Sequence, residues 1–369
     1  MPALMPGGPR PIPPLDALPA YHVPHASAPI DLALHGNEGP APAPAILGAL
    51  DDVETLRRYP SAAALEAKLA ARLGVPAAHV LVTAGADDAL DRTFRAYLAG
   101  GWGRREVILP SPTFVMLPHY AKVVGAEVVQ VPWPAEVFPE DAVRAAITPD
   151  TRAIALVTPN NPTGAVIAPE VIQRIAAAAP DALMMVDLAY GEMAAIDVSA
   201  AARACPNALV YRTFSKAWGL AGARVGYVEG PPHLLAPLRA VAPPFAVSGP
   251  SLALANARLQ MGDAGLGAYV ASVQNERVHL FMALAELGTP VRSQANFVFA
   301  RLASPAHAVR LRDALAAVGI GIRAFPGDPE LADSVRITCP GDVASMDRLV
   351  SALNNAARDG ASPKLQEER

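Results

Sequence analysis

The chain has 369 residues, 52% of them hydrophobic and 5% aromatic, so it can form one large or two ordinary domains with an aliphatic core. Its formal net charge of −4, without a long basic run, excludes an electrostatic footprint for nucleic acid or an anionic membrane surface. Cys205 and Cys339 lie far apart and the histidines show no metal-ligand spacing, so we expect neither a disulfide nor a metal site.

The amino terminus, residues 1–30, is rich in proline and lacks the apolar core of a signal peptide, so it is expected to form an arm. Tyr21 in this arm could dock onto another surface. The longest uncharged stretch, 240–257, is broken by prolines and cannot form a spanning helix. These features predict a cytoplasmic protein.

The first ordered elements follow the arm. Residues 31–40 predict a short strand and a turn whose small residues would let a ligand approach the backbone. Tyr59 lies in an extended segment from which its phenol can project outward. Ser61 is a plausible N-cap for a helix over 62–73, because leucines recur there at helical spacing.

From residue 80 onward strands and helices alternate. Strands are predicted at 80–84, 106–109, 127–131, 153–157, 183–186, 208–214 and 224–228. Repeated βα units imply a largely parallel sheet covered on both faces, with the ligand beyond the strand ends.

Past Ser248 the pattern changes to a long helix and a smaller α/β unit, which we expect to share its sheet with the N-terminal strand. The predicted division is an arm at 1–30, a large domain at 51–248, a small domain from 31–50 with 249–360, and a frayed tail at 361–369.

A strand, a glycine turn and a helix start follow one another at Gly85-Ala86-Asp87-Asp88. Backbone N–H groups at a helix start lack helical partners, so this is a candidate anion site. The two carboxylates suit the helix dipole but would repel a phosphate. Only the backbone N–H groups should therefore face one.

Lys216 lies between a hydroxyl-rich strand end and a glycine-broken turn. An amine held among apolar groups loses its proton more easily, which is the condition for attacking a carbonyl carbon. Thr213, Ser215 and Arg224 would offer hydroxyls and a positive fork to a nearby phosphate. A lone Ser-Lys pair is more often an ordinary solvated lysine, so the other strand ends must decide.

Three further strand ends carry suitable groups. Phe114 could stack on a flat ring, with core packing an equal alternative, and Asn161 lies in a tight turn that exposes an amide. Asp187 ends a buried strand and needs a cationic partner, which a protonated pyridine nitrogen would be. Together with Lys216 these groups meet the needs of pyridoxal phosphate.

At these positions the sequence resembles a known family, from about residue 32 to about residue 353. Asn161-Pro-Thr-Gly, Asp187-x-x-Tyr190 and Ser215-Lys216 followed by Arg224 resemble the fold-type I, pyridoxal phosphate-dependent aminotransferases of class I/II. The segments that look most like the histidinol-phosphate aminotransferase branch are Arg57-Arg-Tyr59-Pro, Gly85-Ala-Asp87, Ser293-x-Ala-Asn296-Phe297 and Val335-Arg-Ile-Thr338. The resemblance implies an α/β fold with a mostly parallel seven-stranded sheet sandwiched by helices, plus a smaller α/β domain.

The resemblance also implies roles for single residues. Lys216 would be the Schiff-base lysine and proton shuttle, and Asp187 would pair with the pyridinium nitrogen. Asn161 and Tyr190 would hold the ring hydroxyl, and Phe114 would stack on the ring. The phosphate would be held by backbone N–H groups of Ala86 and Asp87, by Thr213, Ser215 and Arg224, and by Tyr59 of the neighbouring subunit of an obligate homodimer.

Substrate-side roles follow in the same way. Arg336 matches the arginine that grips a carboxylate or the phosphate of histidinol phosphate, and Arg323 and Tyr21 match residues near the distal group. Asn37 belongs to a turn that reads Asn37-Glu38-Gly39-Pro40 instead of the family's Asn-Glu-Asn-Pro. Phe114 replaces a more usual tyrosine, and a Cys339-Pro-Gly-Asp turn follows the last strand. Since these differences cluster near the substrate, they leave its identity open.

The resulting hypothesis is a ping-pong amino transfer between histidinol phosphate, or a related aromatic or polar amino acid, and 2-oxoglutarate. A decarboxylase or oxidase of a phosphorylated or basic amino acid is the alternative on the same fold. A non-catalytic regulator that binds the cofactor is disfavoured, because no helix-turn-helix or basic patch precedes the fold. A nicotinamide-dependent dehydrogenase is disfavoured too, because no Gly-x-Gly-x-x-Gly follows a strand.

Overall fold

The structure is a computed structural model, which describes residues 15, 18, 29–101, 103–134 and 136–358. Tyr21, most of the expected arm and nearly all of the expected tail therefore lie outside the described residues. Within these ranges no helix has both the length and the apolar character needed to cross a membrane.

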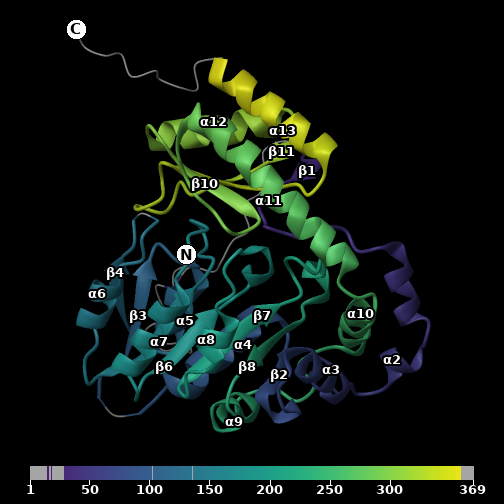
Figure 1. Cartoon of the computed structure of the whole chain (residues 1–369), viewed down its shortest axis with the longest axis vertical. Coiled ribbons are helices and arrows are strands. Elements are labelled where there is room, and N and C mark those ends of the chain that lie inside the picture. The colour runs from purple at the N-terminus through teal and green to yellow at the C-terminus, as the bar shows by residue number, and fades with distance from the viewer. Residues whose placement is uncertain (1–14, 16–17, 19–28, 102, 135, 359–369) are drawn as a thin grey trace, which may run out of the picture.

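A seven-stranded sheet forms the centre of the larger part of the molecule (Figure 1), with the order β2-β8-β7-β6-β5-β3-β4. β8 runs antiparallel to β2 and β7 and the other pairs are parallel, so the predicted mostly parallel sheet is confirmed. The strands are β2 (Val80–Thr83), β3 (Glu106–Ser111), β4 (Glu127–Pro132), β5 (Thr151–Val157), β6 (Leu183–Asp187), β7 (Ala208–Thr213) and β8 (Gly226–Glu229).

Helices cover both faces of this sheet, which is why β6 is buried along its whole length. One face packs with α4 (Gly85–Tyr97), α5 (Met116–Val123) and α9 (Pro232–Ala240). The other packs with α6 (Glu140–Ala145), α7 (Pro169–Ala178) and α8 (Ser199–Arg203). A sheet covered on both faces can be entered by a ligand only beyond the strand ends.

Two sequence-based boundaries are wrong. Arg224 does not begin β8 but follows the 3-10 helix η4 (Ala221–Ala223) in the left-handed region, with φ of 51°. Ser61 does not cap α3 (Ala63–Leu73), because the N-cap is Ala62 and makes no side-chain capping bond. The Ser61 hydroxyl accepts a hydrogen bond from Ala63 N–H at 3.4 Å.

The smaller part contains a four-stranded antiparallel sheet, in the order β12-β13-β10-β9. Its strands are β9 (Gly288–Val291), β10 (Phe297–Leu302), β12 (Arg323–Ala324) and β13 (Ser334–Thr338). It packs with α11 (Ala264–Ala285), α12 (Pro305–Ala317) and α13 (Val343–Ala356). The large and small domain boundaries near residues 51 and 249 stay a prediction.

The sequence predicts that the N-terminal strand shares the sheet of the smaller part, but this strand does not join the four-stranded sheet. β1 (Leu32–Ala33) instead pairs in parallel with β11 (Ile320–Gly321). β11 is a separate short strand from β12, which pairs with β13. This pairing brings the following turn, residues 35–40, beneath the smaller part. A segment near the start of the described chain therefore lies beside a segment of the smaller part that comes much later in the sequence.

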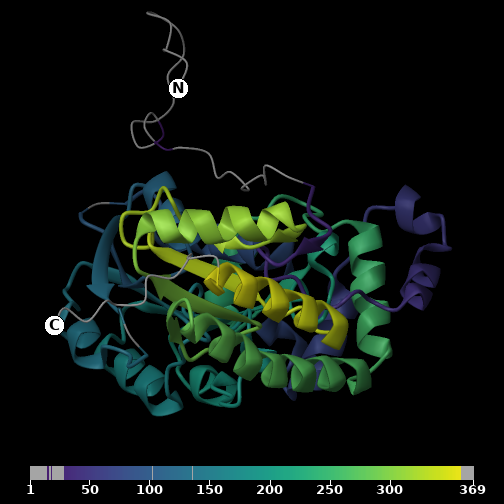
Figure 2. The same ribbon diagram turned by 90° about the horizontal axis from the view of Figure 1, so that it is seen from above.

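The remaining elements of the described residues are short helices and one longer helix. They are η1 (Pro44–Leu50), α2 (Glu54–Arg57), η2 (Ala77–His79), η3 (Gly191–Met193) and α10 (Gly249–Gln260). Seen from above, the segment with η1 and α2 stands out at one side of the molecule, where it contacts α10 (Figure 2).

Candidate active site

Lys216 follows β7, and its amine meets the N-terminal turn. Nζ donates a hydrogen bond to the Gly36 carbonyl at 2.9 Å and lies 5.7 Å from the centre of the Tyr190 ring. The side chain is half-buried. Burial first, and the Arg336 guanidinium second, lower the pKa of Lys216 to about 8. The amine is therefore neutral far more often than an exposed lysine near neutral pH, as a nucleophile must be.

Asp187 is the last residue of β6 and is only 6% exposed. Its Oδ1 accepts the Ala189 N–H at 2.9 Å, and among the described residues it has no ion-pair partner within 4.0 Å. Burial raises the pKa of this carboxyl to about 6. A buried carboxylate without a cation is costly, so a protonated ring nitrogen would supply the charge that this position lacks.

Tyr190 and Asn37 belong to one buried hydrogen-bond network. Asn37 Nδ2 donates to the Tyr190 hydroxyl at 3.0 Å, and Thr338 Oγ1 donates to Asn37 Oδ1 at 3.0 Å. Asn296 Nδ2 donates to the Asn37 carbonyl at 3.2 Å. Burial raises the pKa of the Tyr190 hydroxyl, which therefore stays a donor. The network fixes the N-terminal turn against the strand end that carries Asp187.

Arg336 on β13 joins the same place from the smaller part. One guanidinium nitrogen donates to Asn161 Oδ1 at 2.6 Å, and the other donates to the His35 carbonyl at 2.7 Å. Arg323 is the cross-strand partner of Arg336, so the two side chains leave the same face of the sheet. The Arg323 guanidinium lies 5.4 Å from the centre of the Phe325 ring. Of the two, Arg336 is the one whose charge acts on Lys216.

The first turn of α4, the candidate anion cradle, begins at Gly85. A Cβ at Gly85 would lie 2.7 Å from the Arg224 guanidinium, and one at Gly226 would lie 2.7 Å from the Ala86 nitrogen. Only glycine allows β8 and Arg224 to approach the first turn of α4 so closely. The N–H groups of that turn have no helical partner, so they and Arg224 suit a phosphate.

The side chains around the cradle are paired with one another. Arg224 donates to Ser215 Oγ at 3.3 Å and to Asp87 Oδ2 at 3.1 Å. The Thr213 hydroxyl accepts the Ser215 N–H at 3.0 Å. Asp88 turns back to accept the Ala84 N–H at 2.8 Å. Of the two acidic residues, Asp87 is thus the one that holds the arginine expected to bind phosphate.

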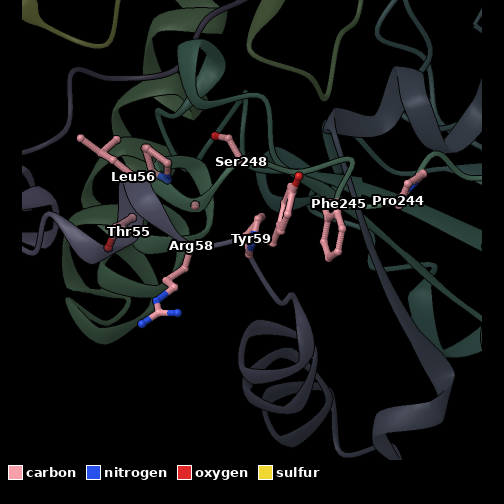
Figure 3. Close-up of a pocket in the computed structure, with 10 residues that line it drawn as sticks. Thr55, Leu56, Arg58, Tyr59, Pro244, Phe245 and Ser248 are labelled. Carbon is pink, nitrogen blue, oxygen red and sulfur yellow. The ribbon is translucent and has the colours of Figure 1, made fainter.

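Two expected cofactor residues make contacts other than those described above. Phe114 is half-buried and packs against the core under α4, so its stacking on a ring stays a prediction. Tyr59 is 82% exposed, and its ring stacks on Phe245 with 4.5 Å between centroids (Figure 3). Both rings line a surface cavity of about 520 Å³ that also includes Arg58 and Ser248. Tyr21 lies outside the described residues.

Sequence reasoning missed one close backbone approach. A Cβ at Gly39 would lie 1.7 Å from the Lys216 carbonyl oxygen, and one at Gly219 would lie 2.2 Å from the Pro40 carbonyl oxygen. The two turns therefore touch backbone to backbone. The glycine in the Asn37-Glu38-Gly39-Pro40 turn was the available signal, since it stands where the resembling family has asparagine.

The fold and this constellation define a class of protein, and the sequence comparison agrees. Residues 33–353 match the family described as aminotransferase class I and II. The chain belongs to this family. It is a pyridoxal phosphate-dependent aminotransferase that acts on small amino and keto acids.

Particular relatives carry two different substrate names. Histidinol-phosphate aminotransferase 2 of Ralstonia nicotianae is 38% identical over 302 residues, 79% of each chain. The aromatic amino acid aminotransferase of Streptomyces avermitilis is 36% identical over 341 residues, 88% of this chain and 91% of the relative. The crystal structure of histidinol-phosphate aminotransferase from Sinorhizobium meliloti in complex with pyridoxal-5'-phosphate is similar, with a TM-score of 0.82, 26% identity and coverage of 95% and 98%.

Proposed function

We propose that the enzyme moves an amino group between histidinol phosphate, or a related aromatic or polar amino acid, and 2-oxoglutarate in two half-reactions. The observation that carries this proposal is the Lys216 amine, with its pKa of about 8, beside the Arg336 guanidinium. When bound, pyridoxal phosphate supplies the electron sink for the charge left at the substrate Cα.

The protein groups then have separate tasks. Lys216 would take the proton from the substrate Cα and deliver it to the C4′ carbon of the cofactor, a transfer that requires an amine that is neutral near pH 8. Asp187 stabilises positive charge at the ring nitrogen. Asn161 and Tyr190 orient the ring through its hydroxyl. The phosphate is bound by the N–H groups of Ala86 and Asp87, by Thr213, Ser215 and Arg224, and by Tyr59 of a second subunit.

The two arginines support anionic substrates. Arg336 is held by the His35 carbonyl and Asn161, so its fork is fixed, and it is only 8% exposed. A fixed guanidinium binds a carboxylate or a phosphate in two-pronged fashion. 2-Oxoglutarate brings two carboxylates and histidinol phosphate brings one phosphate, so Arg323 is assigned the distal group. The names of two relatives support histidinol phosphate and aromatic amino acids as amino donors.

The experiment is to mix the purified holoenzyme separately with L-histidinol phosphate, glutamate, and aromatic or basic amino acids, and to record the cofactor absorbance. Conversion to the pyridoxamine form by histidinol phosphate and glutamate supports the proposal. Conversion by aromatic amino acids and not by histidinol phosphate would mean that an aromatic amino acid is the amino donor instead of histidinol phosphate. Release of carbon dioxide without pyridoxamine formation would favour the decarboxylase alternative.

The homodimer is part of the proposal. Exposed apolar side chains gather on η1, α2 and the loop before α10, where Val53 is 71%, Leu56 74% and Phe245 55% exposed. Tyr59 lies among them. A second copy of the chain would remove this apolar surface from water and bring Tyr59 to the partner's phosphate site.

Subunit mixing tests the shared site. Lys216→Ala and Tyr59→Ala subunits are unfolded together and refolded as mixed dimers. If Tyr59 acts across the interface, each mixed dimer has one intact site and activity rises above that of either variant alone. No gain on mixing would place Tyr59 in the site of its own chain. The cytoplasmic location stays a prediction.

A further inference from the structure

Trp218 lies two residues after Lys216 and is enclosed by charged groups. It is 4% exposed. The indole Nε1 donates a hydrogen bond to Glu192 Oε1 at 3.2 Å. The guanidinium carbons of Arg72 and Arg258 lie 5.1 Å and 5.2 Å from the centre of its ring. An aromatic ring with two guanidinium contacts and a bonded N–H has little freedom to move.

Each partner comes from a different segment. Arg72 is on α3 and also pairs with Asp263 at 3.0 Å, at the start of α11. Arg258 is on α10, and its Nε donates to the Trp218 backbone carbonyl at 3.2 Å. The turn after Lys216 is therefore attached through both its main chain and its side chain. These contacts reach three helices around the site.

Glu192 connects this turn to the strand end that carries Asp187. It lies in η3, two residues after Tyr190. Its Oε1 also lies 3.5 Å from Arg212 on β7, while Oε2 is buried and has no hydrogen-bond partner within the part of the chain that the structure describes. A buried carboxylate with one unsatisfied oxygen lowers the stability of the fold, so its presence calls for a functional reason.

We propose that Trp218 is a positioning residue, which acts through its bond to Glu192 to hold the Lys216 amine at its place over the Tyr190 ring. Glu192 follows Tyr190 and Trp218 follows Lys216, so the bond closes a short bridge between the two loops. The role of Lys216 itself rests on the proposed function above.

Loosening this bridge should let water reach the amine. The groups that act on Lys216 from the surrounding elements stay in place: Arg336 and Arg224 lower its pKa, and Glu38 and Asp87 raise it. Because burial is the largest cause of the low pKa, added solvation should raise the pKa towards the ordinary lysine range.

The test compares Trp218→Phe with Trp133→Phe in cofactor-free protein. Trp133 is 1% exposed and its Nε1 has no hydrogen-bond partner among the described residues, so that control makes the same change of volume without losing a bond. Lysine reactivity towards an amine reagent is measured against pH, with the modified peptides separated by mass spectrometry. The exposed Lys68 and Lys122 serve as references in every sample.

In Trp218→Phe we expect the midpoint of the curve of Lys216 reactivity against pH to rise by about one pH unit, with no change in Trp133→Phe. In holoenzyme the kcat of Trp218→Phe should fall about ten- to a hundredfold, as expected for a misplaced reacting group. An unchanged Lys216 midpoint in a folded Trp218→Phe protein would overturn the proposal. If instead Lys216→Ala kept full activity while the midpoint still rose, the proposed function would fail and the positioning would stand.

Glu192 variants provide the second arm. Glu192→Gln keeps an oxygen acceptor for the indole N–H and should behave like the parent protein, whereas Glu192→Ala should reproduce the shift. The double variant Trp218→Phe/Glu192→Ala should show no larger shift than either single change, because both remove the same bond. Additive shifts would show that the two residues act separately, and would overturn the bridge.

Discussion

The two sides of the site are built in different ways. On the cofactor side, Asp187, Lys216 and the first turn of α4 lie at or just after the ends of β6, β7 and β2 of one sheet. On the substrate side, Asn37 bonds Thr338 across 301 residues of sequence. The first side is positioned by regular secondary structure and the second by tertiary contacts. The differences from the resembling family at Gly39, Phe114 and the turn after β13 all lie outside the strands themselves.

The largest effect should come from the cofactor side. Lys216→Ala removes the amine that moves the proton, so turnover should fall by at least about 10²–10⁴-fold. The fold should survive, because a buried amine with a lowered pKa contributes no favourable charge burial. Steady-state rates and the thermal unfolding midpoint check both statements, with Lys122→Ala as an exposed control. A variant that transaminates at a comparable rate would remove Lys216 from the mechanism.

On the same side, Asp187→Asn should lower turnover and yet raise the stability of the cofactor-free protein near neutral pH. Turnover should fall by roughly 10²–10³-fold, because a preorganised charge is lost. In cofactor-free protein the folded pKa of about 6 lies above the ordinary 3.8, so the folded state holds its proton more strongly. Stability should therefore fall as pH rises from about 4 to 6, by on the order of 3 kcal/mol.

An asparagine side chain does not titrate, so the variant lacks the dependence of stability on pH that the Asp187 carboxyl causes. The cofactor-free Asp187→Asn protein should be more stable than the parent at pH 7 and equal to it below pH 4. Thermal unfolding of both proteins across this pH range makes the comparison. A variant that is less stable at pH 7 would mean that a cation already pairs with the carboxylate.

On the substrate side, Gly39→Ala should force the two turns apart. Its Cβ would lie 1.7 Å from the Lys216 carbonyl oxygen, and overpacking of this kind costs about 1–3 kcal/mol. Gly222→Ala is the control, since its Cβ meets no atom within 4 Å. Denaturant unfolding and the KM for each substrate are the measurements. Equal behaviour of the two variants would show that the turns can separate freely.

The smallest effect should come from Asp87→Asn. Asp87 and Arg224 form a half-exposed ion pair at 3.1 Å, and such pairs contribute about 0–1 kcal/mol. Releasing Arg224 for the phosphate should strengthen cofactor binding by no more than about fivefold. Asp91→Asn breaks the comparable pair with Arg95 on the same helix and should leave binding unchanged. Weaker cofactor binding in Asp87→Asn would mean that this carboxylate orients the arginine.

The difference between the two sides also explains what could be predicted. Apolar runs and glycine turns placed Asp187, Lys216 and Gly85 at strand ends, because strand periodicity is a local property of sequence. The contact of Gly39 with the Lys216 carbonyl and the enclosure of Trp218 by Arg72 and Arg258 escaped prediction. Each joins segments that only the finished fold brings together, so a local pattern such as the glycine at position 39 can mark a close approach but cannot name its partner.

The bond between Asn37 and Thr338 has a consequence for synthesis. The two residues are separated by 301 positions, which a ribosome needs about 15–60 seconds to cover at roughly 5–20 residues per second. The last strand of the central sheet ends at Glu229, so all of its strands are made before Thr338. The sheet that carries Lys216 can therefore form during synthesis while the N-terminal turn still lacks its partner on β13.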